Sequence, residues 1–309
     1  MPLNPAVREY LARQEEAQIP SIEKLSPAEA RYYSRLRSQA AVLPDVVSRD
    51  ILVSGRDGLL TARIYEPDGD GPFPILVWFH GGGWVVGDLY GTDIQAKAIS
   101  EQTGCIVASI DYRLAPETKF PGPVEDCYSA TEWVYRNALE LNGNPNKIAV
   151  GGSSAGGNLA AAVSLMARDR NASYIKFQLL VYPVTDRNLD TKSYIDNSHG
   201  YSLTRDAMRW YWDHYLDSDS DALNPYAAPL QSCHLTGLPD ALIVAAEYDP
   251  LRTEAEKYAE AMASANVRVE YKCYDGLIHG FFGLANEIPA ARVAFSNTCE
   301  SLIEAFKGK

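Results

Sequence analysis

Two short glycine-rich segments hold the residues of this sequence best suited to chemistry. Residues 80–83 (HGGG) follow the apolar run 75–79, and residues 152–156 (GSSAG) follow the apolar run 148–150. A G-x-S-x-G pentapeptide on a strand-to-helix turn presents its serine hydroxyl at a strained corner. A glycine-rich loop after an earlier strand can aim backbone N–H groups at the same point. The two segments together predict a nucleophile and a cradle for the negative charge that its attack creates.

Two neighbouring serines compete for the role of nucleophile, and the glycine spacing separates them. Ser154 has a glycine two positions before it and another two positions after it, whereas Ser153 has a glycine before it but an alanine after it. Small residues at both flanks relieve crowding at such a turn, which favours Ser154. The backbone N–H of Ala155 and N–H groups of the 81–83 loop are then the expected oxyanion donors.

A serine hydroxyl becomes a good nucleophile only when a base takes its proton, and histidine is the usual base. In α/β-hydrolases the serine, the acid and the histidine follow one another in that order along the chain. Among the five histidines only His279 lies beyond the last strand that could carry the acid. The other four are His80, His199, His214 and His234. His279 is therefore the predicted base, in a loop spanning residues 275–281.

The acid is expected just after the strand that precedes the histidine. Residues 241–246 form that strand and lead into Glu247 and Asp249, which a proline follows. Asp249 stands at the turn and is the favoured acid, while Glu247 is expected to be buried in a supporting role. Asp275 is a third option, but it lies only four residues before His279 and could instead order the loop.

Alternating strands and helices must position these side chains. A half-buried strand is expected at 60–65, and further strands at 75–79, 105–110, 147–150, 177–182, 241–246 and 267–271. Helices are expected at 93–102, 124–141, 156–168, 251–263 and 290–306. Repeated strand–helix units predict an α/β fold with a mostly parallel central sheet and helices on both faces.

Two segments stand apart from this alternation. Residues 1–45 show helical spacing of apolar side chains, and residues 186–225 are polar and aromatic, with a helix expected at 204–216. We expect both to form a helical cap over the carboxyl edge of the sheet, where such folds bind ligands. The chain would then be a single α/β domain, with its catalytic core at 46–185 and 226–309.

The composition of the chain argues against several classes of binding partner and structural site. The chain has 309 residues and a net charge of −12, so nucleic acid and anionic membrane surfaces are unfavourable partners. Its five cysteines show no C-x-x-C spacing, which argues against a zinc site or a disulfide framework and suits a reducing compartment. The longest apolar runs are strand-sized, and residues 1–18 lack a signal-peptide core. These features predict a cytoplasmic protein without a membrane span.

With these residues assembled, the chain resembles the hormone-sensitive-lipase family, which includes the bacterial family IV carboxylesterases. The resemblance covers roughly residues 75–285. It rests on an ordered series of motifs: HGGGW (80–84), DYRLAPE (111–117), GSSAGG (152–157), YPVTD (182–186), DPLR (249–252) and HGF (279–281). It implies an α/β-hydrolase core, a helical cap and hydrolysis of small carboxylic esters with short to medium acyl chains. Homodimers are frequent in this family.

The resemblance also implies roles for particular residues. Ser154, Asp249 and His279 would form the triad, and Gly82, Gly83 and Ala155 would donate to the oxyanion. His80 and the loop 111–117 would act as structural supports, the loop through ion pairs of Asp111, Arg113 and Glu117. A triad that works through an acyl-enzyme needs neither a metal nor an organic cofactor.

Two departures and two alternative functions remain open. The family's commonest elbow has aspartate where this chain has Ser153, and DPLR continues with Thr253-Glu254 instead of an aspartate. The same fold serves as a small-molecule receptor in the plant gibberellin receptors, which resemble this family but lack the catalytic histidine. His279 is present here, which favours the enzyme. An amidase or an acyl transferase would use the same triad.

Overall fold

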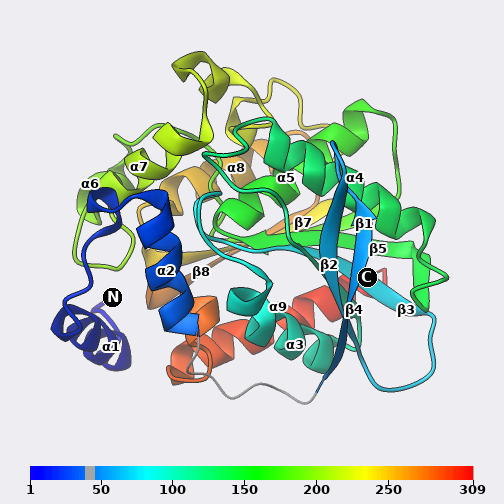
Figure 1. Cartoon of the computed structure of the whole chain (residues 1–309), viewed down its shortest axis with the longest axis horizontal. Helices are drawn as coiled ribbons and strands as arrows, with labels where there is room; N and C mark the ends of the chain where they lie inside the picture. Colours follow the sequence, from blue (N-terminus) through cyan, green and yellow to red (C-terminus); the bar gives the residue numbers. More distant parts are fainter. Residues whose placement is uncertain (39–45, 309) are drawn as a thin grey trace.

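The computed structural model describes residues 1–38 and 46–308, so residues 39–45, the end of the expected cap segment 1–45, lie outside the described residues, as does residue 309. The described residues form eight strands in one sheet, in the order β1-β2-β4-β3-β5-β6-β7-β8 (Figure 1). Their bounds are β1 Val47–Ser54, β2 Leu59–Glu66, β3 Phe73–Phe79, β4 Ile106–Ile110, β5 Gly143–Ser153, β6 Ile175–Val181, β7 Asp240–Tyr248 and β8 Val269–Ile278.

In this spatial order the strands from β4 to β8 pair in parallel, whereas β2 pairs antiparallel with both β1 and β4. The α-helices of the described residues are α1 Pro5–Glu16, α2 Pro27–Ser38, α3 Leu89–Thr103, α4 Gly122–Arg136, α5 Ala155–Asp169, α6 Lys192–Asp196, α7 Arg205–Tyr215, α8 Arg252–Ser264 and α9 Pro289–Phe306. Short 3₁₀ helices lie at η1 Ile22–Lys24, η2 Asp219–Leu223, η3 Pro229–Gln231 and η4 Phe281–Leu284. The predicted fold class is confirmed.

Helices cover both faces of the sheet because the central strands are apolar on both sides. Along β3, Val77 packs into the core shared with α4, α5 and α8, while Trp78 packs into the core shared with α3 and α9. Figure 1 shows these two groups of helices on opposite sides of the sheet. This sandwich fixes the carboxyl ends of β3, β5, β7 and β8 relative to one another, and the candidate residues follow those ends.

Helices α1, α2, α6 and α7, which belong to the two segments outside the strand–helix alternation, appear on the same side of the view in Figure 1. The short helix η1 contacts α7, so the segments meet each other as well as the sheet. From α2, Arg31 donates to the backbone carbonyls of Val85 and Ala115 and pairs with Glu117. The N-terminal segment is thereby joined to the loops that follow β3 and β4.

The structure differs from the sequence-based expectation at several element boundaries and contains elements that the sequence did not predict. The helix expected at 124–141 ends at Arg136, because Asn137 leaves the helical conformation with φ of −107° and ψ of 17°, and the chain continues as turns to Asn142. Strand β8 runs on to Ile278, past a register irregularity beside Tyr248, so His279 follows a strand directly rather than lying in a loop at 275–281. Strand β1 and the short helix α6 were not predicted. Most of β1 is solvent-exposed, and its apolar run is only three residues long, at 51–53, with polar residues on either side.

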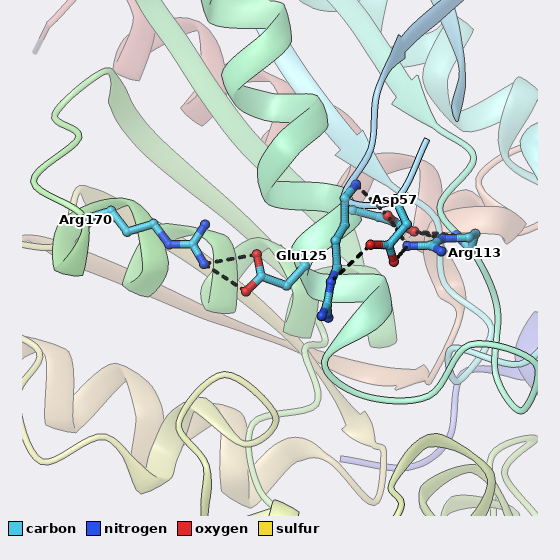
Figure 2. Close-up of polar contacts among 6 residues, drawn as sticks. Asp57, Arg113, Glu125 and Arg170 are labelled. Atoms are coloured by element: carbon cyan, nitrogen blue, oxygen red, sulfur yellow. Dashed lines mark hydrogen bonds and ion pairs between the residues drawn. The ribbon is translucent and has the colours of Figure 1, made fainter. Parts of the chain in front are cut away.

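A group of ion pairs holds the loop that follows β4 against α4 (Figure 2). Arg113 donates to both carboxylate oxygens of Asp126, at 2.7 and 2.8 Å, and also pairs with Asp57. Asp126 is fully buried, whereas the neighbouring pair between Arg170 and Glu125 is partly exposed at both ends. Of the three residues expected to form ion pairs in this loop, Arg113 pairs with Asp126 and Asp57, and Glu117 pairs with Arg31. For Asp111 the described residues show no ion pair.

These two pairs should differ sharply in their contribution to stability. Replacing Arg113 with methionine leaves the buried Asp126 carboxylate without its cation, and we expect a loss of about 3 kcal/mol in the free energy of unfolding. The matched change Arg170→Met removes an exposed pair and should cost less than about 1 kcal/mol. Chemical denaturation of the three proteins measures both values, and equal losses would contradict the burial argument.

Candidate active site

Ser154 occupies the turn between β5 and α5, and its backbone is held in an unusual conformation. Its φ is 57° and its ψ −119°, and its N–H donates to the carbonyl of Val181 at 2.9 Å. The flanking glycines are required sterically. A Cβ atom on Gly156 would lie 1.9 Å from the Phe79 carbonyl oxygen, and one on Gly152 would lie 2.5 Å from the same atom. The corner therefore exists only because both positions lack side chains.

The structure brings Ser154, His279 and Asp249 into one hydrogen-bonded chain. His279 Nε2 lies 3.0 Å from Ser154 Oγ, and His279 Nδ1 lies 2.8 Å from Asp249 Oδ2. Asp249 is fully buried, and its Oδ1 accepts the backbone N–H of Leu251 at 2.9 Å. A carboxylate accepts only, so Nδ1 carries a proton toward Asp249, and Nε2 is free to accept from the serine hydroxyl.

The other two candidate carboxylates lie elsewhere. Glu247 accepts the backbone N–H of Gly276 at 2.7 Å and contacts the amino group of Met1. Its side chain is 20% exposed, so the expectation that it is buried was wrong, because it points to the terminal segment instead of into the core. Asp275 lies on β8, and its side chain is exposed. Of the three, Asp249 is the one hydrogen-bonded to His279.

The glycine loop after β3 lies beside the serine. Gly82 and Gly83 have φ values of 118° and 57°, and the Gly82 carbonyl accepts the N–H groups of Val85 and Val86. A Cβ atom on Gly83 would lie 2.0 Å from the ring of Tyr211, which comes from α7. Within residues 1–38 and 46–308, no protein acceptor binds the backbone N–H of Gly82, Gly83 or Ala155.

His80 sits beneath this loop. Its ring stacks on Tyr112 at a centroid distance of 4.3 Å, and its Nδ1 lies 2.8 Å from the Gly81 carbonyl, to which it donates. Burial lowers the pKa of His80, so the imidazole is neutral and suited to packing. Tyr112 also donates to the His80 carbonyl at 2.8 Å. These contacts tie the loop at 111–117 to the glycine loop.

A pocket of about 470 Å³ opens over Ser154. Its floor is formed by the glycine loop, the serine turn and His279, and its walls come from both outer segments. The N-terminal wall includes Tyr10, Leu11 and Ile22, and the wall from the insertion includes Leu203, Ala207 and Tyr211. The pocket therefore combines residues from segments far apart in the chain, from Tyr10 to Gly280.

Tyr182 belongs to this pocket but was not singled out from the sequence. Its ring packs beside the His279 ring at a centroid distance of 4.6 Å, and its φ of 36° is rare for a residue with a side chain. Burial raises the pKa of Tyr182, so its hydroxyl stays protonated. The motif at 182–186 was the available signal. Ser153 itself is buried at the end of β5, in the place of the family's usual aspartate.

Glu254 is a buried carboxylate below the turn that carries Asp249. Its Oε1 accepts the N–H groups of Thr185 and Asp186, at 2.7 and 3.2 Å. Burial raises the pKa of Glu254 well above its ordinary value, against the effect of these two hydrogen bonds. The folded protein thus favours the protonated form of this side chain.

The raised pKa of Glu254 makes the free energy of unfolding depend on pH. Above the ordinary glutamate pKa of about 4.3, the unfolded chain gives up the proton that the folded chain retains, so folding stability falls as pH rises. We expect Glu254→Gln to raise the melting temperature relative to the wild type, by more at about pH 8 than at about pH 5. Glu256→Gln changes an exposed residue of the same helix and serves as the control. A gain that is equal at both pH values would contradict the argument.

Within the described residues, no cluster of three or more histidine, cysteine, aspartate or glutamate side chains could hold a metal ion. Those residues also include no helix whose length and apolar character would let it cross a membrane. All five cysteines are free, and Cys105, Cys127 and Cys299 are buried.

Comparison with known proteins identifies the family. A family model described as alpha/beta hydrolase fold matches residues 76–283, which is more than half of the chain. The chain belongs to the hormone-sensitive-lipase family of α/β-hydrolases. It is accordingly a hydrolase of the carboxylesterase type. The predicted family is confirmed.

Relatives and solved structures agree with this assignment. The chain is 39% identical to the carboxylesterase NlhH of Mycobacterium tuberculosis, over 84% of this chain and 83% of that protein. It is 42% identical to the carboxylic ester hydrolase LipN of the same organism, over 76% of this chain and only 64% of LipN. The hyperthermophilic esterase from Pyrobaculum calidifontis superposes with a TM-score of 0.95 at 40% identity, covering 98% of this chain and 99% of that one.

Proposed function

We propose that this protein hydrolyses carboxylic esters of small alcohols and short- to medium-chain acids through a covalent acyl-enzyme. One observation carries the proposal: a buried carboxylate, an imidazole and a serine hydroxyl form a continuous chain, at 2.8 and 3.0 Å, beside backbone N–H groups that find no acceptor among the described residues. The names of the relatives described above support the same reaction class.

The proposed reaction starts with proton transfer. His279 Nε2 takes the hydroxyl proton of Ser154 as Oγ attacks the ester carbonyl carbon, and Asp249 stabilises the imidazolium that forms. The N–H groups of Gly82, Gly83 and Ala155 bind the oxyanion. His279 then protonates the leaving alcohol as the C–O bond breaks. Water repeats the sequence on the acyl-enzyme and releases the acid, which restores the serine.

The size of the pocket supports the proposed substrates. A volume of about 470 Å³, shared between the acyl and alcohol sides, suits small esters more than long acyl chains. We further propose that residues 1–45 and 186–225 act as the cap that sets this limit, since both supply pocket walls in their described parts. We also propose that the enzyme is cytoplasmic and that it can form a homodimer.

An acyl-length series tests the proposed function. Purified protein is assayed on p-nitrophenyl esters from acetate to laurate, and a serine-directed phosphonate is used to label the reactive residue. We expect the highest kcat/KM on acetate to hexanoate and a single label on Ser154, located by peptide mass spectrometry. Binding of these esters without turnover would point to a receptor, and a label on Ser153 would refute the assignment of the nucleophile.

The glycine loop gives a separate prediction. Gly83→Ala places a Cβ atom 2.0 Å from the Tyr211 ring at a φ of 57°, so the loop must shift away from the oxyanion position. We expect kcat on p-nitrophenyl butyrate to fall by about 10²–10³, the usual effect of losing one oxyanion donor.

The double variant Gly83→Ala/Tyr211→Ala separates the steric contact from the conformational strain. Removing the ring gives the new methyl group space, so part of the lost kcat should return, while the positive φ remains unfavourable. A single Gly83→Ala variant with wild-type kcat would exclude this loop from the reaction.

A further inference from the structure

The turn that carries Asp249 is bound to a helix of the insertion, and this contact has a consequence for catalysis. Ser193 lies in α6, is fully buried, and comes from a part of the chain more than fifty residues before the turn. Its Oγ donates to the Pro250 carbonyl at 2.6 Å and accepts the backbone N–H of Thr253 at 3.1 Å. One hydroxyl thus joins both ends of the turn.

Two further hydrogen bonds strengthen the connection. The backbone N–H of Ser193 donates to Thr253 Oγ1 at 3.3 Å, and Asn197 Nδ2 donates to the Asp249 carbonyl at 3.3 Å. Asn197 is also buried. The turn is therefore oriented both by the end of β7 and by α6 with Asn197, which bind the backbone of the turn at several points.

The Pro250–Leu251 peptide unit links these contacts to the catalytic carboxylate. The carbonyl of this unit accepts from Ser193 Oγ, and the N–H of the same unit donates to Asp249 Oδ1 at 2.9 Å. A peptide unit is planar, so fixing the direction of its carbonyl also fixes the direction of its N–H. Donation to the carbonyl further polarises the unit and strengthens the N–H as a donor.

We propose that Ser193 is a positioning residue for Asp249, acting through the Pro250–Leu251 peptide unit. This inference rests on the proposed function, because it assigns Asp249 the role of the acid. The carboxylate has two oxygens: one is held by Leu251, and the other meets His279. Rotation of the peptide unit would turn the first oxygen and so displace the second from the imidazole.

The replacement Ser193→Ala tests the inference. It removes the donor to the Pro250 carbonyl, and we expect kcat on p-nitrophenyl butyrate to fall about tenfold with KM unchanged, since small misplacements of reacting groups act on kcat. The acid limb of the profile of kcat/KM against pH should also move to lower pH. A displaced carboxylate stabilises the imidazolium less, so the neutral base persists at lower pH.

The other groups near the triad stay the same in this variant. Tyr182 and Ser154 face His279, and Glu254 and Tyr194 lie near Asp249. Ser198→Ala changes a serine of the same insertion whose hydroxyl contacts His199, and it should behave as the wild type. Ser193→Thr keeps the hydroxyl and should restore the acid limb.

The outcomes separate the inference from simpler explanations. A folded Ser193→Ala variant with wild-type kcat and pH profile refutes it, as does lower activity with an unmoved acid limb, which indicates a structural role only. If the alanine variant does not fold, Ser193→Cys fills the site with a weaker donor, and the same two readouts decide. A wild type without esterase activity refutes the proposed function and this inference together, whereas an active wild type matched by Ser193→Ala refutes this inference alone.

Discussion

Replacing Ser154 with alanine is expected to lower the rate of p-nitrophenyl butyrate hydrolysis by about 10⁵-fold or more, as removal of a serine nucleophile does in other triads. The fold should be unaffected. Alanine has the same Cβ atom as serine, so the φ of 57° is no more strained, and the backbone hydrogen bond to the Val181 carbonyl is kept. Thermal unfolding and the initial rate, measured on the same preparation, check both parts.

Ser153→Ala is the matched control for this experiment. It removes the hydroxyl of the neighbouring serine, which lies at the end of β5 and is buried. We expect hydrolysis within about tenfold of the wild type, because the hydroxyl hydrogen-bonded to His279 is still present. If the losses were exchanged between the two variants, the serine at 153 would be the nucleophile.

Asp249→Asn should lower kcat by about 10⁴-fold with little change in fold. The Leu251 N–H at 2.9 Å from Oδ1 selects the orientation of the new amide, since only its oxygen can accept that hydrogen bond. The amide nitrogen then faces His279 Nδ1 and donates to it. Nδ1 must accept, the ring proton moves to Nε2, and the imidazole can no longer take the proton of Ser154.

Asp275→Asn changes the remaining carboxylate close to His279 in sequence and serves as the control. This residue is exposed on β8, and we expect kcat close to that of the wild type. Steady-state kinetics at neutral pH compare the two variants. A severe loss in Asp275→Asn, with little effect of Asp249→Asn, would reassign the acid.

Much of the fold could be predicted from the sequence because its central strands are apolar runs and because glycine marks the end of a helix. The run at 75–79 falls inside β3, and Gly104 ends α3 in a left-handed conformation as a C-terminal glycine does. Strand β1 was missed because a mostly exposed edge strand carries polar residues on both faces. The extra length of β8 depends on pairing with β7, which no local pattern encodes.

Some residues of the candidate site could likewise be predicted from the sequence, and others could not. Ser154 and the glycine loop have a local signature, since their backbone conformations require specific neighbours. His279 and Asp249 required the order of the motifs along the chain in addition. Ser193 and Asn197 had no signal at all, because their partners lie more than fifty residues away and a buried serine resembles any other serine in the sequence. Polar networks that connect distant segments become visible only in three dimensions.

The contact between Tyr211 and Gly83 has a consequence for protein engineering. The tyrosine ring shapes the space available to an incoming ester and at the same time presses against the backbone of the glycine loop. Mutant libraries that vary this position to alter selectivity will therefore change turnover in the same step. Such libraries should therefore be selected for selectivity and turnover together, and they should also vary residues of the glycine loop.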